Sequence, residues 1–140
     1  MKRFVYICSP LRGDMERNIE KARQYCRYAV LLNPDVVPIA PHIYFTQCLN
    51  DNLPDERVLG MNDGLEMLRR CDELWVYEPE KLSEGMQREI EYAHQLGIPI
   101  RNGYKAQWNH SAESCVSCGD IIQEGRQVCP TCEAKGGRRI

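Results

Sequence analysis

The chain has 140 residues, of which 43% are hydrophobic and 27% are charged. These values are ordinary for a soluble globular protein built around one mid-sized domain. The formal net charge of −2 gives no general attraction to nucleic acid or to an anionic membrane surface, so we expect neither as a partner. The apolar run at residues 4–8 is too short for a signal-peptide core or a spanning helix. We therefore expect a cytoplasmic protein whose first strand is this run.

Strand and helix patterns then alternate along the chain. A turn through Pro10 and Gly13 precedes a helix expected at residues 15–32, where apolar residues recur every three or four positions. Further strands are expected at residues 36–40, 72–77 and 98–100, and further helices at residues 54–70 and 83–96. Residues 41–54 are expected to form a long loop. This alternation implies βαβ crossovers, and therefore an α/β domain with a flavodoxin-like or Rossmann-like parallel sheet and flanking helices over residues 1–102.

The pattern stops after residue 102. We expect a linker at residues 103–112, a small separate unit at residues 113–135 and a flexible tail at residues 136–140. The small unit contains the motif C-x2-C-x10-C-x2-C, formed by Cys115, Cys118, Cys129 and Cys132. This ligand type and spacing predict a zinc ribbon with structural Zn²⁺, because four thiolates leave no open coordination position. Two separate C-x-x-C redox motifs are the alternative.

The ribbon lacks a basic stripe with interspersed aromatic residues, so packing or dimerisation is favoured over nucleic-acid binding. The other four cysteines lie in apolar-patterned segments, as expected of ordinary core thiols. They are Cys8, Cys26, Cys48 and Cys71.

One carboxylate interrupts the apolar face of the helix expected at residues 83–96. At about 100° per residue, Glu89 falls between Ala93 and Leu96 on the apolar side. Charged groups are seldom buried without a partner or a function, so Glu89 is a candidate catalytic residue. The alternative is a carboxylate at the edge of the apolar stripe that reaches solvent or pairs with an arginine.

Two turns at the expected carboxyl edge of the sheet carry candidate binding residues. Ser83 is a favourable N-cap. Gly85 has no side chain to cover the backbone N–H groups at the start of the helix, so they are accessible to an anion or a hydroxyl. A plain helix cap explains the same two residues. Arg12 follows the first strand, and its planar guanidinium suits a phosphate, although a surface arginine is the simpler interpretation. Tyr6 has a hydroxyl that needs a buried partner, which a carboxylate on the neighbouring βα unit would supply.

Four segments within residues 2–101 together resemble the nucleoside 2-deoxyribosyltransferase superfamily, nearest to its deoxynucleoside 5′-monophosphate N-glycosidases. They are Tyr6-x-Cys8-x-x-x-Arg12-Gly13, Asp63 before Leu65-Glu66, Cys71-Asp72-Glu73-Leu74-Trp75-Val76, and Ser83-x-Gly85-Met86-x-x-Glu89-Ile90-x-x-Ala93.

This resemblance implies that Glu89 attacks C1′ of a 2′-deoxynucleotide and forms a covalent glycosyl-enzyme, as in a retaining glycosidase. It also implies that Tyr6 orients Glu89 and that Asp63 assists the leaving base. A Ser at position 83, where nucleoside transferases carry an acid, favours a 5′-monophosphate substrate. His42, Tyr44 and Phe45 would border the base. The implied substrate-binding residues are Ser9, Arg12, Gly13, His42, Ser83, Gly85 and Met86.

By the same analogy we expect a small-molecule deoxynucleotide as ligand, a homodimer or higher oligomer, and no cofactor for catalysis. A second function stays open at this point. The domain would bind a nucleotide or an ADP-ribose-type ligand without cleaving it, and the ribbon would recruit a partner.

Overall fold

The computed structural model describes residues 1–108, 112–114 and 121–123. The chain divides into two compact units, Met1–Gly103 and Tyr104–Ile140. No helix in the described part of the chain is long and apolar enough to cross a membrane.

The first unit is built on one parallel sheet of four strands, in the order β2-β1-β3-β4. The strands are β1 (Arg3–Cys8), β2 (Val36–Ile39), β3 (Glu73–Val76) and β4 (Ile100–Asn102). The expected parallel α/β architecture is therefore confirmed. The chain moves outward from β1 to β2 and then returns to β3 on the other side of β1. This reversal creates a crevice at the carboxyl ends of β1 and β3, where ligands bind in open α/β sheets.

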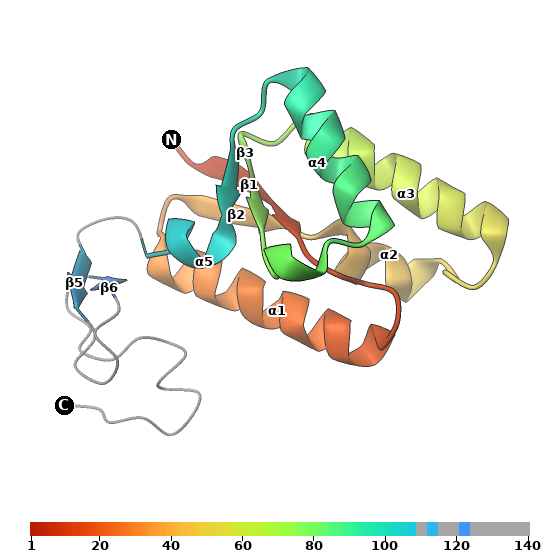
Figure 1. The fold of residues 1–140 in the computed structure, drawn as a ribbon, viewed down its shortest axis with the longest axis horizontal. Coiled ribbons are helices and arrows are strands. Elements are labelled where there is room, and N and C mark those ends of the chain that lie inside the picture. Colours follow the sequence, from red (N-terminus) through yellow and green to blue (C-terminus); the bar gives the residue numbers. More distant parts are fainter. Residues whose placement is uncertain (109–111, 115–120, 124–140) are drawn as a thin grey trace. The chain divides into compact units, whose positions relative to one another are not determined.

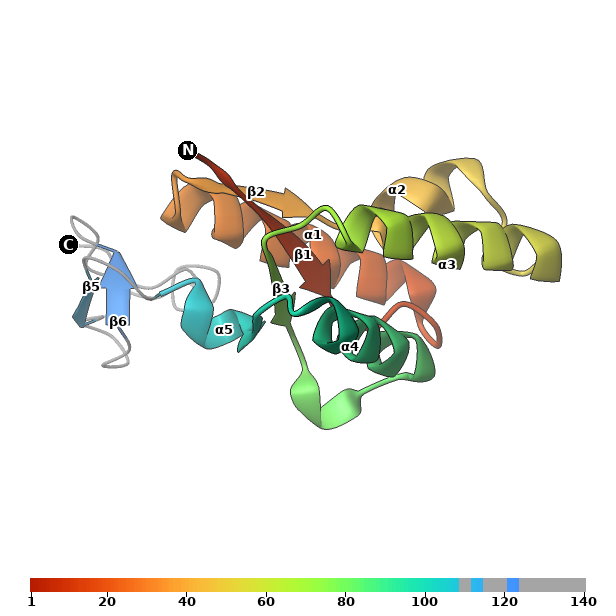
Figure 2. The ribbon, with the colours of Figure 1, turned by 90° about the horizontal axis from the view of Figure 1, so that it is seen from above.

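Helices cover both faces of this sheet. α1 (Met15–Leu32) lies on one face, whereas α3 (Pro54–Leu68) and α4 (Glu84–Leu96) lie side by side on the other (Figures 1 and 2). Strand side chains alternate between the faces: Tyr6 and Cys8 join the core beneath α3 and α4, and Tyr77 stacks on Tyr25 of α1. Because of this alternation, Tyr6 and Cys8 lie on the same face of the sheet, so both side chains can take part in one site.

Residues 41–54 are not the expected loop throughout. Pro41–Cys48 form a helix, α2, that carries His42 and Phe45. Pro41 stands in its first turn, where the missing N–H of proline costs nothing. The short segment has no clear apolar stripe, so its periodicity did not reveal the helix. α2 contacts α3, and both follow β2 in the chain.

Two shorter features complete the first unit. The 3₁₀ turn η1 (Pro79–Lys81) links β3 to α4. β4 begins two residues later than expected. The carbonyl of Pro99 accepts a hydrogen bond from the N–H of Leu74, but the paired register with β3 starts at Ile100.

The described residues of the second unit include two short antiparallel strands, β5 (Ala112–Ser114) and β6 (Ile121–Gln123). A short helix, α5 (Gly103–Ala106), occupies the start of the segment assigned to a linker. The four cysteines predicted to bind zinc, and the predicted tail, lie outside the described residues.

Candidate functional site

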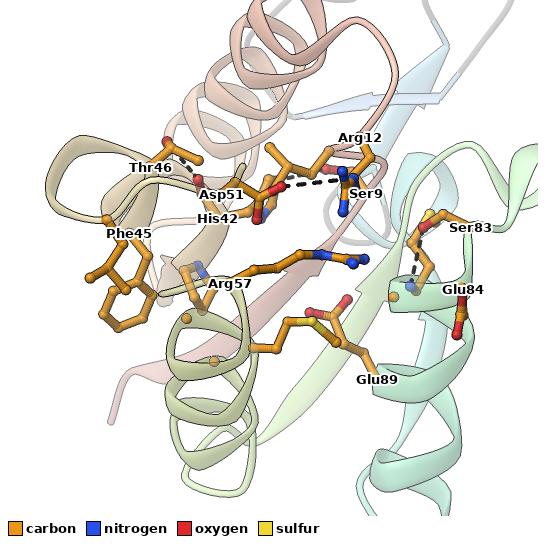
Figure 3. Close-up of a pocket in the computed structure, with 18 of the residues that line it drawn as sticks. Ser9, Arg12, His42, Phe45, Thr46, Asp51, Arg57, Ser83, Glu84 and Glu89 are labelled. Atoms are coloured by element: carbon orange, nitrogen blue, oxygen red, sulfur yellow. Dashed lines mark hydrogen bonds and ion pairs between the residues drawn. The ribbon is translucent and has the colours of Figure 1, made fainter. Parts of the chain in front are cut away.

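A cavity of about 320 Å³ opens at the carboxyl ends of the central strands. This volume lies at the lower end of the range of small-molecule sites. Its walls come from the end of β1, the start of α4, α2, the α2–α3 connection and α3 (Figure 3). The lining residues are Tyr6, Ser9, Leu11, Arg12, Pro41, His42, Phe45, Thr46, Leu49, Asp51, Glu56, Arg57, Gly60, Met61, Gly64, Ser83, Glu84, Gly85, Met86 and Glu89.

Glu89 of α4 presents its carboxylate to this cavity, and both of its oxygens are held from β1. The Tyr6 hydroxyl donates a hydrogen bond to Oε2. The Cys8 thiol donates to Oε1 at 3.4 Å. Tyr6 and Cys8 are two positions apart on one strand, so both point to the same face. The carboxylate therefore has a defined orientation at the cavity wall.

Burial is the dominant influence on the Glu89 side chain and raises its pKa to about 7, although the hydrogen bonds from Tyr6 and Cys8 lower it. The pKa values of the Tyr6 hydroxyl and the Cys8 thiol are raised well above their usual values, first by burial and then by the neighbouring Glu89. Both groups therefore remain protonated donors near neutral pH. Glu89 is the group at this position that changes charge near pH 7.

The start of α4 forms the adjacent wall. Ser83 is the N-cap, and its hydroxyl accepts a hydrogen bond from the N–H of Met86 at 3.2 Å. Gly85 has no side chain to cover the first turn. The side chain of Met86 is buried in the core beneath it. The helix N-terminus therefore faces the cavity with its partial positive charge.

Polar side chains from the β1–α1 turn and from α2 complete the cavity wall. Arg12, in the β1–α1 turn, forms an ion pair with Asp51 at 3.8 Å. Ser9 Oγ lies 3.0 Å from Nε2 of His42. Burial lowers the pKa of His42 to about 4, so its imidazole is neutral at physiological pH. The Ser9–His42 pair can donate and accept hydrogen bonds without adding charge to the cavity.

Most of the predicted site residues meet in this cavity. Tyr6, Ser9, Arg12, His42, Ser83, Gly85, Met86 and Glu89 all line it, and so does Phe45. Three residues with assigned roles do not. Asp63 is exposed on α3, Tyr44 is 63% exposed on α2, and Gly13 is exposed in a turn with φ of 101°. The structure does not bring the Asp63 carboxylate into the cavity next to Glu89.

Sequence reasoning missed the contribution of α3. Arg57, Gly60, Met61 and Gly64 all line the cavity, and their spacing places them on one helix face. Gly60 and Gly64 stand four residues apart, a spacing that favours a close approach on that face. A β-carbon at Gly64 would lie 3.5 Å from the Tyr6 hydroxyl oxygen. The overlooked signal was an arginine one turn before this pair of glycines.

The zinc prediction concerns other residues. Across the described residues, no group of three or more His, Cys, Asp or Glu side chains is placed to hold a metal ion. Cys115, Cys118, Cys129 and Cys132 lie outside those residues.

Two solved structures share this fold. A 2-deoxyribosyltransferase from the psychrotolerant bacterium Bacillus psychrosaccharolyticus superposes with a TM-score of 0.51 at 17% identity, over 69% of each chain. A conserved protein from Enterococcus faecalis V583 has a TM-score of 0.53 at 16% identity, over 71% of this chain and 62% of its own. At such identities the likeness concerns the fold alone. No curated protein matches the sequence.

A family model provides the stronger comparison. It is described as a domain of unknown function, DUF7768, and it matches residues 3–103. The match spans the whole parallel sheet and every wall of the cavity. The chain therefore belongs to the DUF7768 family.

Proposed function

We propose that this protein breaks or transfers the N-glycosidic bond of 2′-deoxynucleoside 5′-monophosphates. The observation that carries the proposal is the Glu89 carboxylate, which faces a ligand-sized cavity with one oxygen held by Tyr6 and the other by Cys8. The fold shared with a 2-deoxyribosyltransferase supports it.

The reaction would proceed by covalent catalysis on Glu89. The ionised carboxylate attacks C1′ of the deoxyribose, the C1′–N bond breaks, and its electron pair leaves with the base, which takes up a proton from water. Water then attacks C1′ and releases the sugar, or a second base does so in a transfer reaction, and Glu89 is regenerated. Tyr6 would keep the carboxylate aimed at the sugar.

The 5′ end of the substrate would lie at the start of α4. Ser83 and Gly85 present a helix N-terminus without a carboxylate at the N-cap position, and Arg12 faces the same cavity. This combination favours a phosphate over a free hydroxyl. The neutral Ser9–His42 pair and Phe45 on α2 would border the base.

One observation favours the second candidate, which is binding of a nucleotide or an ADP-ribose-type ligand without cleavage. Asp63, the residue expected to assist the leaving base, is exposed and is not among the lining residues. A site that holds the sugar and phosphate but lacks a proton donor for the base would bind and not turn over.

The two functions are separated by incubating wild type and Glu89→Gln with each deoxynucleoside monophosphate and measuring free base by chromatography. The enzyme proposal expects release by wild type and a loss of at least about 10³-fold in the variant, as for removal of a covalent nucleophile. Tight binding by both proteins without base release would instead support the binding function.

A further inference from the structure

Arg57 projects into the cavity from α3 and has no role in the function proposed above. It stands one turn before Gly60 and two turns before Gly64, and all three line the cavity. Because neither glycine has a side chain, other parts of the chain approach this face of α3 closely: a β-carbon would lie 3.6 Å from Leu49 at Gly60 and 3.5 Å from Tyr6 at Gly64. Figure 3 shows Arg57 extending toward the side of the cavity where Arg12 and Ser83 lie.

Within the described part of the chain, no side-chain hydrogen bond or ion pair engages the guanidinium of Arg57. Asp51 lies 3.8 Å from Arg12, and its buried Oδ2 has no hydrogen bond. Glu56 Oε1 accepts the N–H of Asn50 at 2.9 Å, Glu84 is largely exposed beside Arg88, and the Glu89 oxygens accept from Tyr6 and Cys8. A partly buried cation without a partner favours an anionic ligand, since ligand binding replaces the solvation that burial removes.

Three donors therefore face one region of the cavity: Arg57 from α3, Arg12 from the β1–α1 turn, and the N-terminus of α4 capped by Ser83. They come from three different elements of the fold. A phosphate group has enough oxygens to accept from all three, and guanidinium groups bind phosphate in a bidentate manner.

We infer that Arg57 is a phosphate-binding residue and the main determinant of selectivity for nucleoside monophosphates over nucleosides. This inference rests on the proposed function for the identity of the ligand, but not on whether the ligand is cleaved. Arg57 would hold the 5′-phosphate against Arg12, while the sugar lies toward Glu89. The competing interpretation is that Arg57 contacts the base, in which case it would serve nucleosides and nucleotides equally.

The test measures dissociation constants by calorimetry in the Glu89→Gln background, so that no turnover occurs. The dissociation constants of deoxynucleoside monophosphates and of the matching deoxynucleosides are measured for the Glu89→Gln protein and for the double variant that also carries Arg57→Gln. We expect the substitution to weaken monophosphate binding by about 10- to 100-fold, the effect of losing a charge-assisted hydrogen bond. Nucleoside binding should change by less than about 2-fold, since the nucleoside lacks the group that Arg57 contacts.

Arg69→Gln is the matched control. Arg69 ends the same helix, pairs with Glu66 and is exposed outside the cavity, so the substitution removes an identical charge without touching the site. It should leave both affinities unchanged. A second measurement uses inorganic phosphate with the otherwise wild-type protein, where Arg57→Gln should weaken binding and Arg69→Gln should not.

Equal weakening of nucleoside and monophosphate would overturn the inference in favour of base contact. Monophosphate binding that is undetectable, or that does not depend on Arg57, would overturn it outright. Failure of the proposed function looks different: wild type would bind monophosphates in an Arg57-dependent manner but release no base.

Discussion

The Tyr6 hydroxyl on β1 donates a hydrogen bond to Oε2 of Glu89 on α4, across 83 positions of the sequence. Because Tyr6 is fully buried, this bond satisfies its hydroxyl and orients a carboxylate that would otherwise rotate freely at the cavity wall. The hydrogen bond connects β1, a central strand of the sheet, to α4, the helix that follows the neighbouring strand β3 in the chain. Several measurable consequences come from it.

The first concerns the pH dependence of base release. Glu89 must be ionised to attack C1′, and burial raises its pKa to about 7. We expect kcat to rise with pH through about 7 and then level off. His42, whose pKa is about 4, stays neutral over this range and contributes no second step. Saturating substrate keeps the ionisation of the free substrate phosphate, near pH 6, out of kcat. A rate that is flat between pH 5.5 and 8.5 would contradict ionisation of Glu89 in the rate-limiting step.

The second concerns stability. The folded-state pKa of Glu89 lies above its value in the unfolded chain, so the folded protein binds the proton more tightly. The contribution of Glu89 to the free energy of unfolding is therefore highest below about pH 4.5 and falls as pH rises toward 7. Glu89→Gln removes the penalty of a buried charge. We expect it to raise the free energy of unfolding at pH 8 by at most about 3 kcal/mol, from about 1.36 kcal/mol per pKa unit.

The gain should disappear at pH 5, where Glu89 is largely protonated in the folded state. Urea denaturation of both proteins at the two pH values provides the measurement. Glu91→Gln, an exposed position on the same helix, is the control. An equal gain at both pH values would indicate that the substitution acts through packing and not through the charge.

The third concerns Cys8, whose thiol donates to the other oxygen of Glu89 at 3.4 Å. Cys8→Ala removes a donor that favours the ionised carboxylate. We expect the pKa of Glu89 to rise further, by about half to one unit, since a net hydrogen bond is worth about 1 kcal/mol. Carboxyl ¹³C NMR titration measures this shift directly. Cys26→Ala, on the opposite face of the sheet in α1, should leave the titration unchanged. A pKa of Glu89 that does not move in folded Cys8→Ala would remove Cys8 from the site.

A separate prediction, independent of Glu89, concerns the second unit. From the four C-terminal cysteines we propose one structural Zn²⁺ per chain. Metal analysis of protein purified without added zinc should find about one equivalent, since four-thiolate sites bind Zn²⁺ tightly. Cys115→Ser should reduce this content, whereas Cys48→Ser, at an exposed free thiol of the first unit, should not. Protein with no zinc, whose melting temperature a chelator leaves unchanged, would refute the assignment.

Local patterns were sufficient for the architecture. The apolar periodicity of residues 15–32 predicted α1 with the bounds that it has, and the misfit of Glu89 on an amphipathic helix located the central carboxylate. Ser83 and Gly97 stand at the two ends of α4, as N-cap and as a left-handed C-cap, and both residue types favour those positions. Each of these signals depends on interactions within one or two helical turns, which is why a single sequence was enough to reveal them.

Other features depend on contacts between distant segments. The helix α2 lacks a clear apolar stripe, and it is packed against α3. In the sequence, Arg57 cannot be told from a surface arginine, and only the position of α3 in the fold brings it into the cavity. The resemblance implied a catalytic role for Asp63, but its side chain is exposed on α3, outside the cavity.

The sequence by itself determined the order of the four parallel strands and the three long helices, and the identity of the acidic residue at the edge of the sheet, because those follow from short-range periodicity and capping. Only the tertiary structure decided which side chains share a cavity with that residue. The rotation of α3 about its axis, which admits Arg57 and excludes Asp63, is set by packing against Tyr6 and Pro41. The glycine pair on α3 marks the close-packed face of the helix, but it does not say which distant segment packs there.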